Sequence, residues 1–491
     1  MGLTRRGVLA GVLAGMAGPV LGEGLTHSLR PMPRPDGGSR DLPQGTGAQG
    51  SASTVVSAAK LGGITGYFVA EAATGRVLEQ ENAAALVPPA SVAKSITALY
   101  ALDRLGPSHR FRTEVHALGQ VSGGRLNGDL VLVGGGDPTL DSDKLGDLVA
   151  DLAATGLREV TGRFLAYAGA LPQFDRITED QPVQVGYNPG LSGLCLNFNR
   201  VNFEWTKGGA TVAMSARGER FVPDVRMARM KVVERESPVF DYRKGQGIED
   251  WSVARGALRK AGSRWLPVRQ VAPYVAEVFQ TLCKAQGIRL KEPEIVTSLP
   301  AGGRVLAGRS SEELPVILRQ MLRFSTNVTA EAVGLASSGA GGLPASASAM
   351  ADWARGSLGL SARMVDHSGL GAASRVTAEG MARALMAGDK RLNLRPVLRK
   401  IPMRDDKGNP IEDHPVKVVG KSGTLNFVSG LAGFIQPPNG RDLCFAIFSA
   451  DVPRREAVPL AEREDAAGSD AWVRRAHLMQ ARLISRWAGM V

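Results

Sequence analysis

Residues 88–102, PPASVAKSITALYAL, form the stretch around which this chain of 491 residues is organised. Two prolines precede Ser91, and apolar residues then recur at helical spacing up to Leu102, so the stretch predicts a helix that Ser91 opens. Residues three apart on a helix share a face, which lets Ser91 Oγ meet Lys94 Nζ near a helix end that favours negative charge. Taken alone, this S-x-x-K string would be more typical of a serine N-cap on an ordinary core helix.

A second S-x-x-K string, Ser57-Ala58-Ala59-Lys60, is predicted to be a chance match. Lys60 runs directly into two glycines and the β-rich stretch 64–70. We therefore expect no helix that would hold Ser57 and Lys60 on one face.

Two further strings separate Ser91 from this chance match. Ser325-Thr326-Asn327 is the only S-x-N string in the chain, and Lys421-Ser422-Gly423 is the only K-[ST]-G string. The order S-x-x-K, S-x-N, K-[ST]-G is the signature of penicillin-interacting serine enzymes, which comprise DD-peptidases and serine β-lactamases. Together the strings supply a nucleophile, a base, polar relay groups and an anion clamp, so they predict a serine acyl-transfer site.

The N-terminus predicts export from the cytoplasm. Arg5 and Arg6 precede an apolar run that reaches residue 22 without a further charge, so we expect an export signal of the twin-arginine type over 1–22. A short membrane anchor that is retained uncleaved is the alternative. Residues 23–54, rich in Gly, Pro, Ser and Thr, are predicted to be a flexible leader. The mature protein is expected to be periplasmic, with at most peripheral membrane association.

Charge and cysteine content exclude several other classes of function. The formal charge is +12, which favours contact with anionic wall polymer or membrane surface, but the charges are dispersed and lack the aromatic interleaving of a nucleic-acid groove. The three cysteines are widely spaced, so we expect buried thiols rather than a disulfide framework, with one bridge as the alternative. No metal-ligand spacing is present, and no metal or cofactor is expected. A triad centred on His367 is disfavoured because its neighbours Asp366 and Ser368 point in different directions.

The coarse pattern predicts an α+β catalytic domain whose sheet joins both ends of the chain. Strands are expected near both termini, over 64–70, 76–78, 416–419, 430–434 and 444–448, and helices over 311–322, 330–335 and 470–487. About 230 residues separate Ser91 from Ser325, which is more than one fold unit needs. We therefore expect a first catalytic part over 55–106, a β-rich inserted domain over 107–267 with a nested subdomain, and a second catalytic part over 268–491.

The chain resembles the class C low-molecular-mass penicillin-binding proteins, a family of D-alanyl-D-alanine carboxypeptidases and endopeptidases. The likeness covers roughly residues 55–490, and it implies a serine penicillin-binding (transpeptidase/β-lactamase-like) domain with a large insertion. Two departures are a threonine, Thr326, where the family commonly has aspartate, and Ser422 where threonine is usual. Beyond the three motifs, the family-like strings are 130–140 (LVLVGGGDPTL), 187–189 (YNP), 197–199 (NFN), 366–370 (DHSGL) and 375–377 (RVT).

The residue types suggest how the serine is activated. An alcohol near its free pKa is a poor nucleophile, so Ser91 needs a base within hydrogen-bond reach, and Lys94 is the candidate. Lys94 can act only when neutral, which requires burial and a second cation, Lys421, to lower its pKa. The resemblance implies that Ser325 Oγ relays a proton between Lys94 and the leaving group, and that the Asn327 amide orients the substrate's peptide carbonyl.

The resemblance also implies how the substrate is held. Lys421 Nζ and the hydroxyls of Ser422 and Thr424, around Gly423, would bind the free C-terminal carboxylate. The backbone N–H groups of Ser91 and Thr424 would form the oxyanion hole. The expected substrates are peptidoglycan stem peptides, from which D-alanine or a cross-linked strand leaves as an acyl-enzyme forms. β-Lactam antibiotics would acylate the same serine.

Two alternatives have specific features for and against them. A serine β-lactamase would need a dedicated deacylating base, and neither a Tyr-x-Asn middle motif nor an obvious glutamate-bearing loop is present. A wall-binding module with a decayed site would explain Thr326, but the nucleophile, base, relay and clamp residues are all intact.

Overall fold

The computed structural model describes residues 51–405, 407–438 and 440–490. The predicted export signal, 1–22, and residues 23–50 of the predicted leader lie outside this part of the chain. Among the described residues, no helix is both long enough and apolar enough to cross a membrane.

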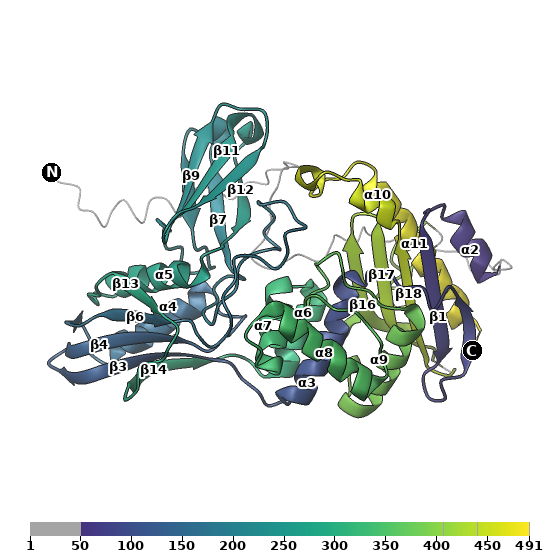
Figure 1. Ribbon diagram of the computed structural model, residues 1–491, viewed down its shortest axis with the longest axis horizontal. Helices are drawn as coiled ribbons and strands as arrows, with labels where there is room; N and C mark the ends of the chain where they lie inside the picture. Colours follow the sequence, from purple (N-terminus) through teal and green to yellow (C-terminus); the bar gives the residue numbers. More distant parts are fainter. Residues whose placement is uncertain (1–50, 406, 439, 491) are drawn as a thin grey trace.

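One six-stranded sheet joins the two ends of the chain, as the sequence predicted (Figure 1). The join is the antiparallel pairing of β1 (Ile64–Glu71) with β18 (Leu443–Ala450). The full strand order is β15-β16-β17-β18-β1-β2. The other four strands are β2 (Val77–Glu81), β15 (Arg399–Lys400), β16 (Lys417–Leu425) and β17 (Val428–Gln436).

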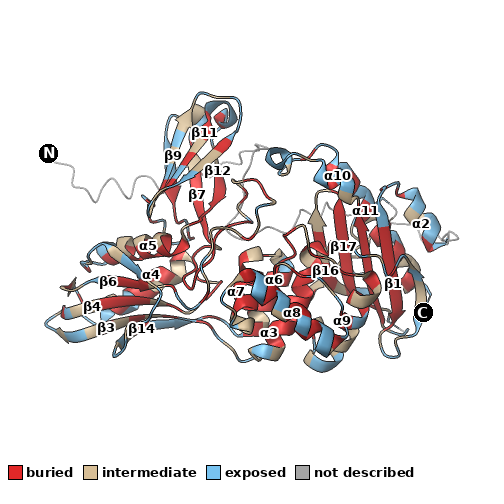
Figure 2. Cartoon of the chain, viewed as in Figure 1, coloured by how far each residue is buried: buried red, intermediate tan, exposed pale blue. Residues whose placement is uncertain are grey.

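Helices cover both faces of this sheet, so its central strands are buried on both sides (Figure 2). Alternate residues of β18 belong to different cores: Phe445 and Ile447 face one helical layer, and Ala446 and Phe448 face the other. The first layer consists of α2 (Ala52–Ala58) and α11 (Ser469–Ala488). The second consists of α3 (Lys94–Arg104), α6 (Leu314–Phe324), α7 (Asn327–Ser338), α8 (Leu343–Leu358) and α9 (Ala378–Leu392).

The chain between α3 and α6 forms an inserted region with its own sheet and hydrophobic core. The sheet has the order β13-β6-β4-β3-β14, with the short strand β5 (Glu159–Val160) beside β4. Two helices, α4 (Ser142–Ala154) and α5 (Val271–Ala285), share the core of this sheet. Its main strands are β3 (Arg112–Ser122), β4 (Arg125–Gly134), β6 (Phe164–Tyr167), β13 (Pro293–Val296) and β14 (Arg304–Ser310).

The inserted region ends later than the sequence predicted. We expected it to span 107–267, but β14 pairs with β3 and β13 pairs with β6, which carries the region to Ser310. The difference arises because both strands lie at edges of the sheet. Their membership is fixed by pairing with strands more than a hundred residues earlier, which no local pattern reveals.

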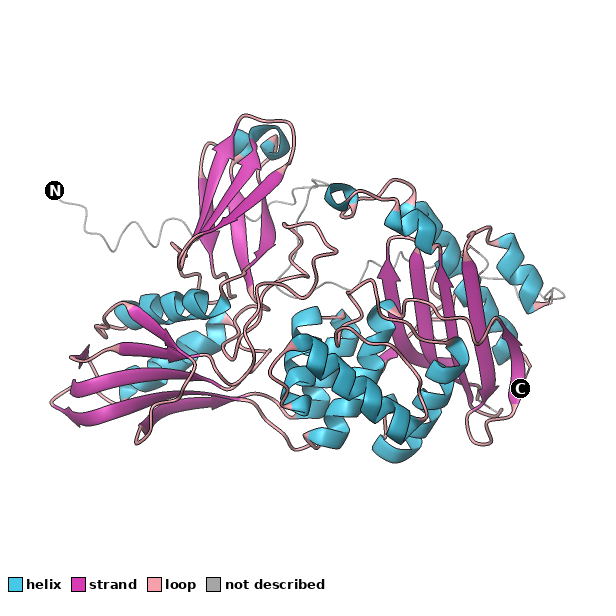
Figure 3. Ribbon diagram, viewed as in Figure 1, coloured by secondary structure: helices cyan, strands magenta, loops and turns pink. Residues whose placement is uncertain are grey.

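A smaller β-rich unit is nested in the insertion between β6 and α5 (Figure 3). It contains two three-stranded sheets with the orders β12-β7-β8 and β10-β11-β9, and it packs around buried aromatic residues such as Phe203 and Trp251. Its strands are β7 (Arg200–Trp205), β8 (Val212–Ser215), β9 (Ala228–Val233), β10 (Phe240–Lys244), β11 (Glu249–Ala254) and β12 (Gly262–Pro267).

The two segments that connect the insertion to the catalytic part lie side by side. Ser311 N donates to Phe111 O at 2.8 Å, and Phe111 N donates to Ser311 Oγ at 2.9 Å. Leu314 N donates to His109 O at 3.0 Å, which fixes the start of α6 against the segment that leaves α3. The insertion is therefore attached through a hydrogen-bonded double connection.

Candidate active site

Ser91 lies where a short 3₁₀ turn, η1 (Ala90–Ala93), continues directly into α3. Lys94, the first residue of α3, is fully buried, and its Nζ lies 2.9 Å from Ser91 Oγ. The predicted sharing of one helical face by these two side chains is thus present, although Ser91 opens the helix through a 3₁₀ turn.

The middle motif meets this pair from the other side. α6 ends at Ser325, whose backbone is left-handed with φ of 58°, and α7 begins at Asn327. Lys94 Nζ donates to Asn327 Oδ1 at 2.7 Å and to the Ser368 carbonyl at 2.8 Å. Thr326, which lies between Ser325 and Asn327 in the chain, is buried and is the N-cap residue of α7.

The third motif occupies β16. Lys421 Nζ donates to Ser325 Oγ at 3.0 Å and to the Ser422 carbonyl at 2.5 Å. The short strand β15 pairs only with Val419 and Gly420, so the following residues of β16 form an open strand edge beside Ser91. Thr424 on this edge lines the same cavity as Ser91. All eight residues that the sequence singled out are therefore gathered around one serine.

Two glycines allow the backbones to approach at this point. A Cβ on Gly423 would lie 2.7 Å from Ser91 N, so only glycine lets β16 lie against the nucleophile's amide. Gly369 has φ of +74°, and a Cβ there would lie 1.9 Å from Ala90 O. The turn that contains Ser368 can therefore press against η1.

Burial sets the protonation of the two lysines. It lowers the pKa of Lys94 to about 7, against the opposing influence of the nearby Glu331 and Asp366 carboxylates. Burial also lowers the pKa of Lys421 well below its ordinary value, and the charge of Lys94 lowers it further. Desolvation is what lowers the pKa of Lys94, and the repulsion between the two lysines acts on the pKa of Lys421. The predicted lowering of the Lys94 pKa by Lys421 stays a prediction.

The two buried carboxylates were missed by the sequence reasoning. Glu331 lies four residues after Asn327 on α7 and Asp366 opens the family-like string 366–370, so both signals were available. Burial and repulsion by Asp366 raise the pKa of Glu331 above its ordinary value, whereas its hydrogen bonds from Ser368 and His367 and the charge of Lys94 favour the ionised form. Burial likewise raises the pKa of Asp366.

Other candidate residues lie apart from Ser91. Ser57 is an exposed residue of α2, a helix that the sequence did not lead us to expect. The helix ends before Lys60, which has a left-handed backbone with φ of 48°. The His367 ring is fully buried and its Nε2 bonds Ser346 Oγ at 2.6 Å, so it forms no triad with Ser91. The three cysteines are buried free thiols.

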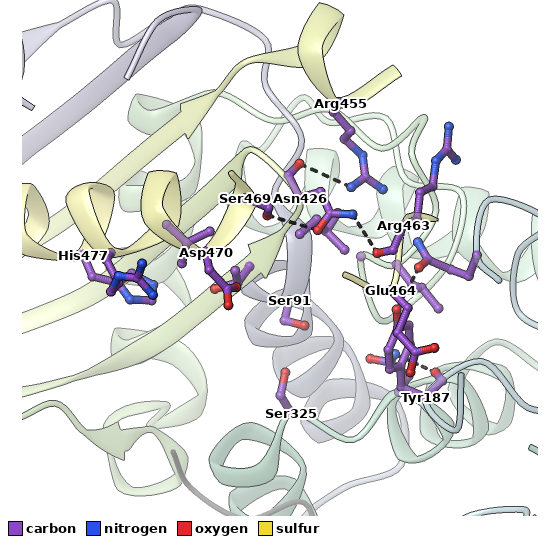
Figure 4. A pocket seen from close by; sticks show the side chains of 18 residues that line it. Ser91, Tyr187, Ser325, Asn426, Arg455, Arg463, Glu464, Ser469, Asp470 and His477 are labelled. Atoms are coloured by element: carbon purple, nitrogen blue, oxygen red, sulfur yellow. Dashed lines mark hydrogen bonds between the residues drawn. The ribbon is translucent and has the colours of Figure 1, made fainter. Parts of the chain in front are cut away.

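A cavity of about 610 Å³ opens from Ser91 (Figure 4). One wall comes from the insertion: Asn327 Nδ2 donates to the Tyr187 carbonyl at 2.8 Å, and Tyr187 Oη donates to Gln181 at 3.0 Å. Of the predicted clamp residues, Thr424 lines this cavity, and Lys421 and Ser422 are not among its lining residues. Its lining further includes Ser325, Gly369, Leu370, Thr424, Leu425, Asn426, Arg455, Arg463, Glu464, Ser469, Asp470, Val473, Arg474 and His477.

A C-terminal segment forms the opposite wall and reaches the insertion. It follows α10 (Val452–Glu456), and its Glu464 pairs with Arg264 and accepts from Gln184 Nε2 at 2.7 Å. The adjacent Arg463 donates from Nη1 to the carbonyl of Asp180 at 3.0 Å. These contacts bridge the catalytic part and the insertion at the rim of the cavity.

Comparison with solved structures agrees with this architecture. Penicillin binding protein 4 (DacB) from Haemophilus influenzae superposes with a TM-score of 0.72 at 19% identity, covering 89% of this chain and 99% of that one. The same protein in complex with a β-lactam gives a TM-score of 0.69 at 18% identity and the same coverage. The likeness confirms the predicted α+β fold with a β-rich insertion.

Comparison of sequences identifies the family. A D-alanyl-D-alanine carboxypeptidase from an Actinomadura species is 28% identical over 427 residues, which cover 79% of this chain and 77% of that protein. D-alanyl-D-alanine carboxypeptidase DacB from Haemophilus influenzae is 22% identical, with 79% and 85% covered. The profile of the D-Ala-D-Ala carboxypeptidase 3 (S13) family matches residues 50–472. The predicted serine DD-peptidase is thereby confirmed over the β-lactamase alternative, and the chain belongs to the D-Ala-D-Ala carboxypeptidase 3 (S13) family.

Proposed function

We propose that this protein cleaves the terminal D-Ala-D-Ala bond, and D-Ala cross-links, of peptidoglycan stem peptides through an acyl-enzyme on Ser91. The observation that carries the proposal is the 2.9 Å contact of Ser91 Oγ with a fully buried Lys94 whose pKa is lowered to about 7. Near neutral pH a large share of this lysine is an uncharged amine, which is the form that can accept the serine proton.

The acylation step follows from these positions. Ser91 Oγ attacks the carbonyl carbon of the penultimate D-alanine while its proton moves to Lys94 Nζ. The C–N bond then breaks, and the proton that Lys94 took from Ser91 passes to the leaving amine through Ser325 Oγ, which Lys421 Nζ holds by a hydrogen bond of 3.0 Å. Water hydrolyses the ester in a second step and restores Ser91. β-Lactams would acylate Ser91 in the same way and leave slowly.

The open edge of β16 supports the binding half of the proposal. An extended peptide can add to this edge by backbone hydrogen bonds. Its terminal carboxylate would meet Lys421, Ser422 and Thr424 beside Gly423, and an incoming anion favours the ammonium form of Lys421. The N–H groups of Ser91 and Thr424 would hold the oxyanion, and one such donor contributes about 3 kcal/mol.

The cavity would hold the part of the stem peptide that precedes the scissile bond. It opens from Ser91 and is lined by Asn327 and Tyr187 as well as by Thr424 of the proposed clamp. Asn327 Nδ2 donates one N–H to Tyr187 O, and an amide nitrogen carries a second N–H that can meet a substrate carbonyl.

Location and domain organisation complete the proposal. A wall-directed substrate and the twin arginines Arg5-Arg6 support export to the periplasm by the twin-arginine route. The catalytic domain would comprise residues 55–106 and 311–491, and the insertion would comprise 107–310.

The function is tested with purified protein and two substrates. One is a stem pentapeptide that ends in D-Ala-D-Ala, and the other is a cross-linked muropeptide dimer, with products identified by mass. Release of a single D-alanine would establish carboxypeptidase action, and conversion of the dimer to monomers would establish endopeptidase action. Absence of both activities in the folded wild-type protein would refute the proposal. Activity that is unchanged in Ser91→Ala would refute it as well.

A further inference from the structure

Glu331 is tied to the base Lys94 through a single residue. Its Oε1 accepts the backbone N–H of Ser368 and its Oε2 accepts that of His367, both at 2.9 Å. The carbonyl of the same Ser368 accepts from Lys94 Nζ at 2.8 Å. A fully buried carboxylate on α7 thus fixes, by both oxygens, the peptide segment that contacts the catalytic base.

Asp366 holds the same turn from its own side. Its Oδ1 accepts from Gly369 N at 2.6 Å and its Oδ2 from Gly371 N at 2.5 Å. The side chain is 1% exposed, so two carboxylates are buried together within the electrostatic reach of Lys94. Burial of charge is expensive unless the charge is partnered, and the cation available to these carboxylates is Lys94.

Three elements contribute ionisable groups to the electrostatic surroundings of Lys94. α7 contributes Glu331, the 366–371 turn contributes Asp366, and β16 contributes Lys421, whose own pKa the Lys94 charge lowers. His367 in the turn stays neutral because burial lowers its pKa to about 3. The two acids favour the ammonium form of Lys94, whereas Lys421 and desolvation favour the amine.

We propose that Glu331 is a positioning residue that fixes the Ser368 carbonyl against Lys94 and, with Asp366, supplies the negative charge that determines when Lys94 becomes a free base. The inference rests on the proposed role of Lys94 and adds to it. Glu331 needs no contact with substrate, because it acts through Ser368 and through its charge. A purely structural tie between α7 and the turn would change the amount of folded enzyme without changing the pH dependence of acylation.

The experiment measures the rate of Ser91 acylation by fluorescent penicillin between pH 5 and 9 for the wild type and Glu331→Gln. Glutamine keeps the shape and one acceptor but cannot ionise, so it removes the negative charge that the two backbone N–H groups and Lys94 favour on Glu331. The acid limb of the profile should therefore move to lower pH by about one unit, since a nearby opposite charge shifts a pKa by about that amount or more. One unit below the wild-type midpoint, the variant should retain several times more of its maximal rate than the wild type.

Glu249 in the insertion provides a matched control. It too is fully buried, and its Oε1 accepts the successive backbone N–H groups of Arg269 and Gln270 at 2.7 and 2.6 Å. Glu249→Gln should leave the pH profile unchanged, because its carboxylate holds the segment between β12 and α5 and not the Ser368 turn. A shift in both variants would mean that the profile reports general loosening and would overturn the inference.

Asp366→Asn is the second variant if Glu331→Gln does not fold. It removes charge from the other side of the same turn and should move the acid limb in the same direction. An acid limb at the wild-type pH in either folded variant, or a shift to higher pH, would overturn the inference. A wild-type protein that penicillin does not label at all would instead refute the proposed function, so the two failures are distinguishable.

Discussion

The catalytic part and the insertion use buried charge differently. Around Ser91, four fully or almost fully buried ionisable groups, Lys94, Lys421, Glu331 and Asp366, lie within electrostatic reach of their neighbours. In the insertion, Glu249 and Arg269 are equally buried, but they bond mainly to backbone groups. Desolvated charge costs free energy in both regions. In the catalytic part, burial lowers the pKa of Lys94, so that this lysine can accept a proton near neutral pH. In the insertion, the buried charges hold loops in place through hydrogen bonds to the backbone.

The largest effect that this comparison predicts concerns the nucleophile. Ser91→Ala should abolish covalent labelling by fluorescent penicillin, because Ser91 carries the one hydroxyl that hydrogen-bonds Lys94 Nζ among the described residues. Ser57→Ala, in the second S-x-x-K string, should label like the wild type, since Ser57 is exposed and Lys60 lies beyond the end of its helix. Peptide mass mapping of the adduct to any residue other than Ser91 would contradict the assignment.

The base should rank second. Lys94→Arg should lower the acylation rate by about a thousandfold, because a guanidinium cannot deprotonate and general-base catalysis is worth about that factor. In the wild type, acylation should fall as pH drops through about 7, the pKa to which burial lowers Lys94, because the active amine becomes an ammonium below it. Stopped-flow acylation gives both quantities, with circular dichroism as the control for folding. Substantial activity in Lys94→Arg would remove Lys94 from the mechanism.

The clamp should give a smaller and more selective effect. Lys421→Ala should reduce kcat/KM about a hundredfold for a peptide with a free terminal carboxylate, since a partly desolvated ion pair contributes about 2–3 kcal/mol. The same peptide with an amidated end never forms that pair, so its loss should be much smaller. Some loss of kcat/KM is expected for both peptides because Lys421 also contacts Ser325. Equal losses on acid and amide would show that Lys421 is not the carboxylate clamp.

The same contrast explains how much of the site could be predicted from the sequence. Four residues of the site belong to short strings in the sequence: Ser91 with Lys94, and Lys421 with Gly423. The spacing within these strings, together with their order along the chain, identifies them. The Ser368 and Tyr187 carbonyls escaped detection because a backbone atom has no residue type, and only tertiary folding brings it to the site. Glu331 escaped for another reason: its place four residues after Asn327 was visible, but an acid on a helix is usually solvated.

The fold shows the same limit. The two strands that join the ends of the chain in one sheet were predictable because β1 and β18 are apolar runs, and burial on both faces requires such runs. The end of the insertion was not, because β14 has exposed residues along most of its length and gains its place by pairing with β3. Local pattern therefore predicts buried strands better than edge strands.

The smallest predicted effect lies at the contact between the two regions. Glu464 on the C-terminal segment pairs with Arg264 of the insertion and accepts from Gln184 at the cavity rim. Its side chain is 29% exposed and that of Arg264 only 4%. Solvent screens the Glu464 charge, and a glutamine can still accept from the buried Arg264, so we expect loss of the charge to cost about 1 kcal/mol or less. Glu464→Gln should therefore lower kcat/KM for a stem pentapeptide by about two- to fivefold.

Penicillin labelling distinguishes this rim effect from damage to the catalytic centre. The antibiotic engages the Ser91 end of the cavity, so its acylation rate should not change in Glu464→Gln. The matched control is Glu462→Gln, an exposed carboxylate two residues earlier for which no contact with the insertion is described. If the pentapeptide and penicillin rates fall together, the bridge supports the catalytic centre itself. If Glu464→Gln and Glu462→Gln behave alike, the bridge contributes nothing to substrate binding. A loss confined to the pentapeptide in Glu464→Gln would show that the insertion takes part in binding the retained half of the substrate, although the bond-making groups all belong to the catalytic part.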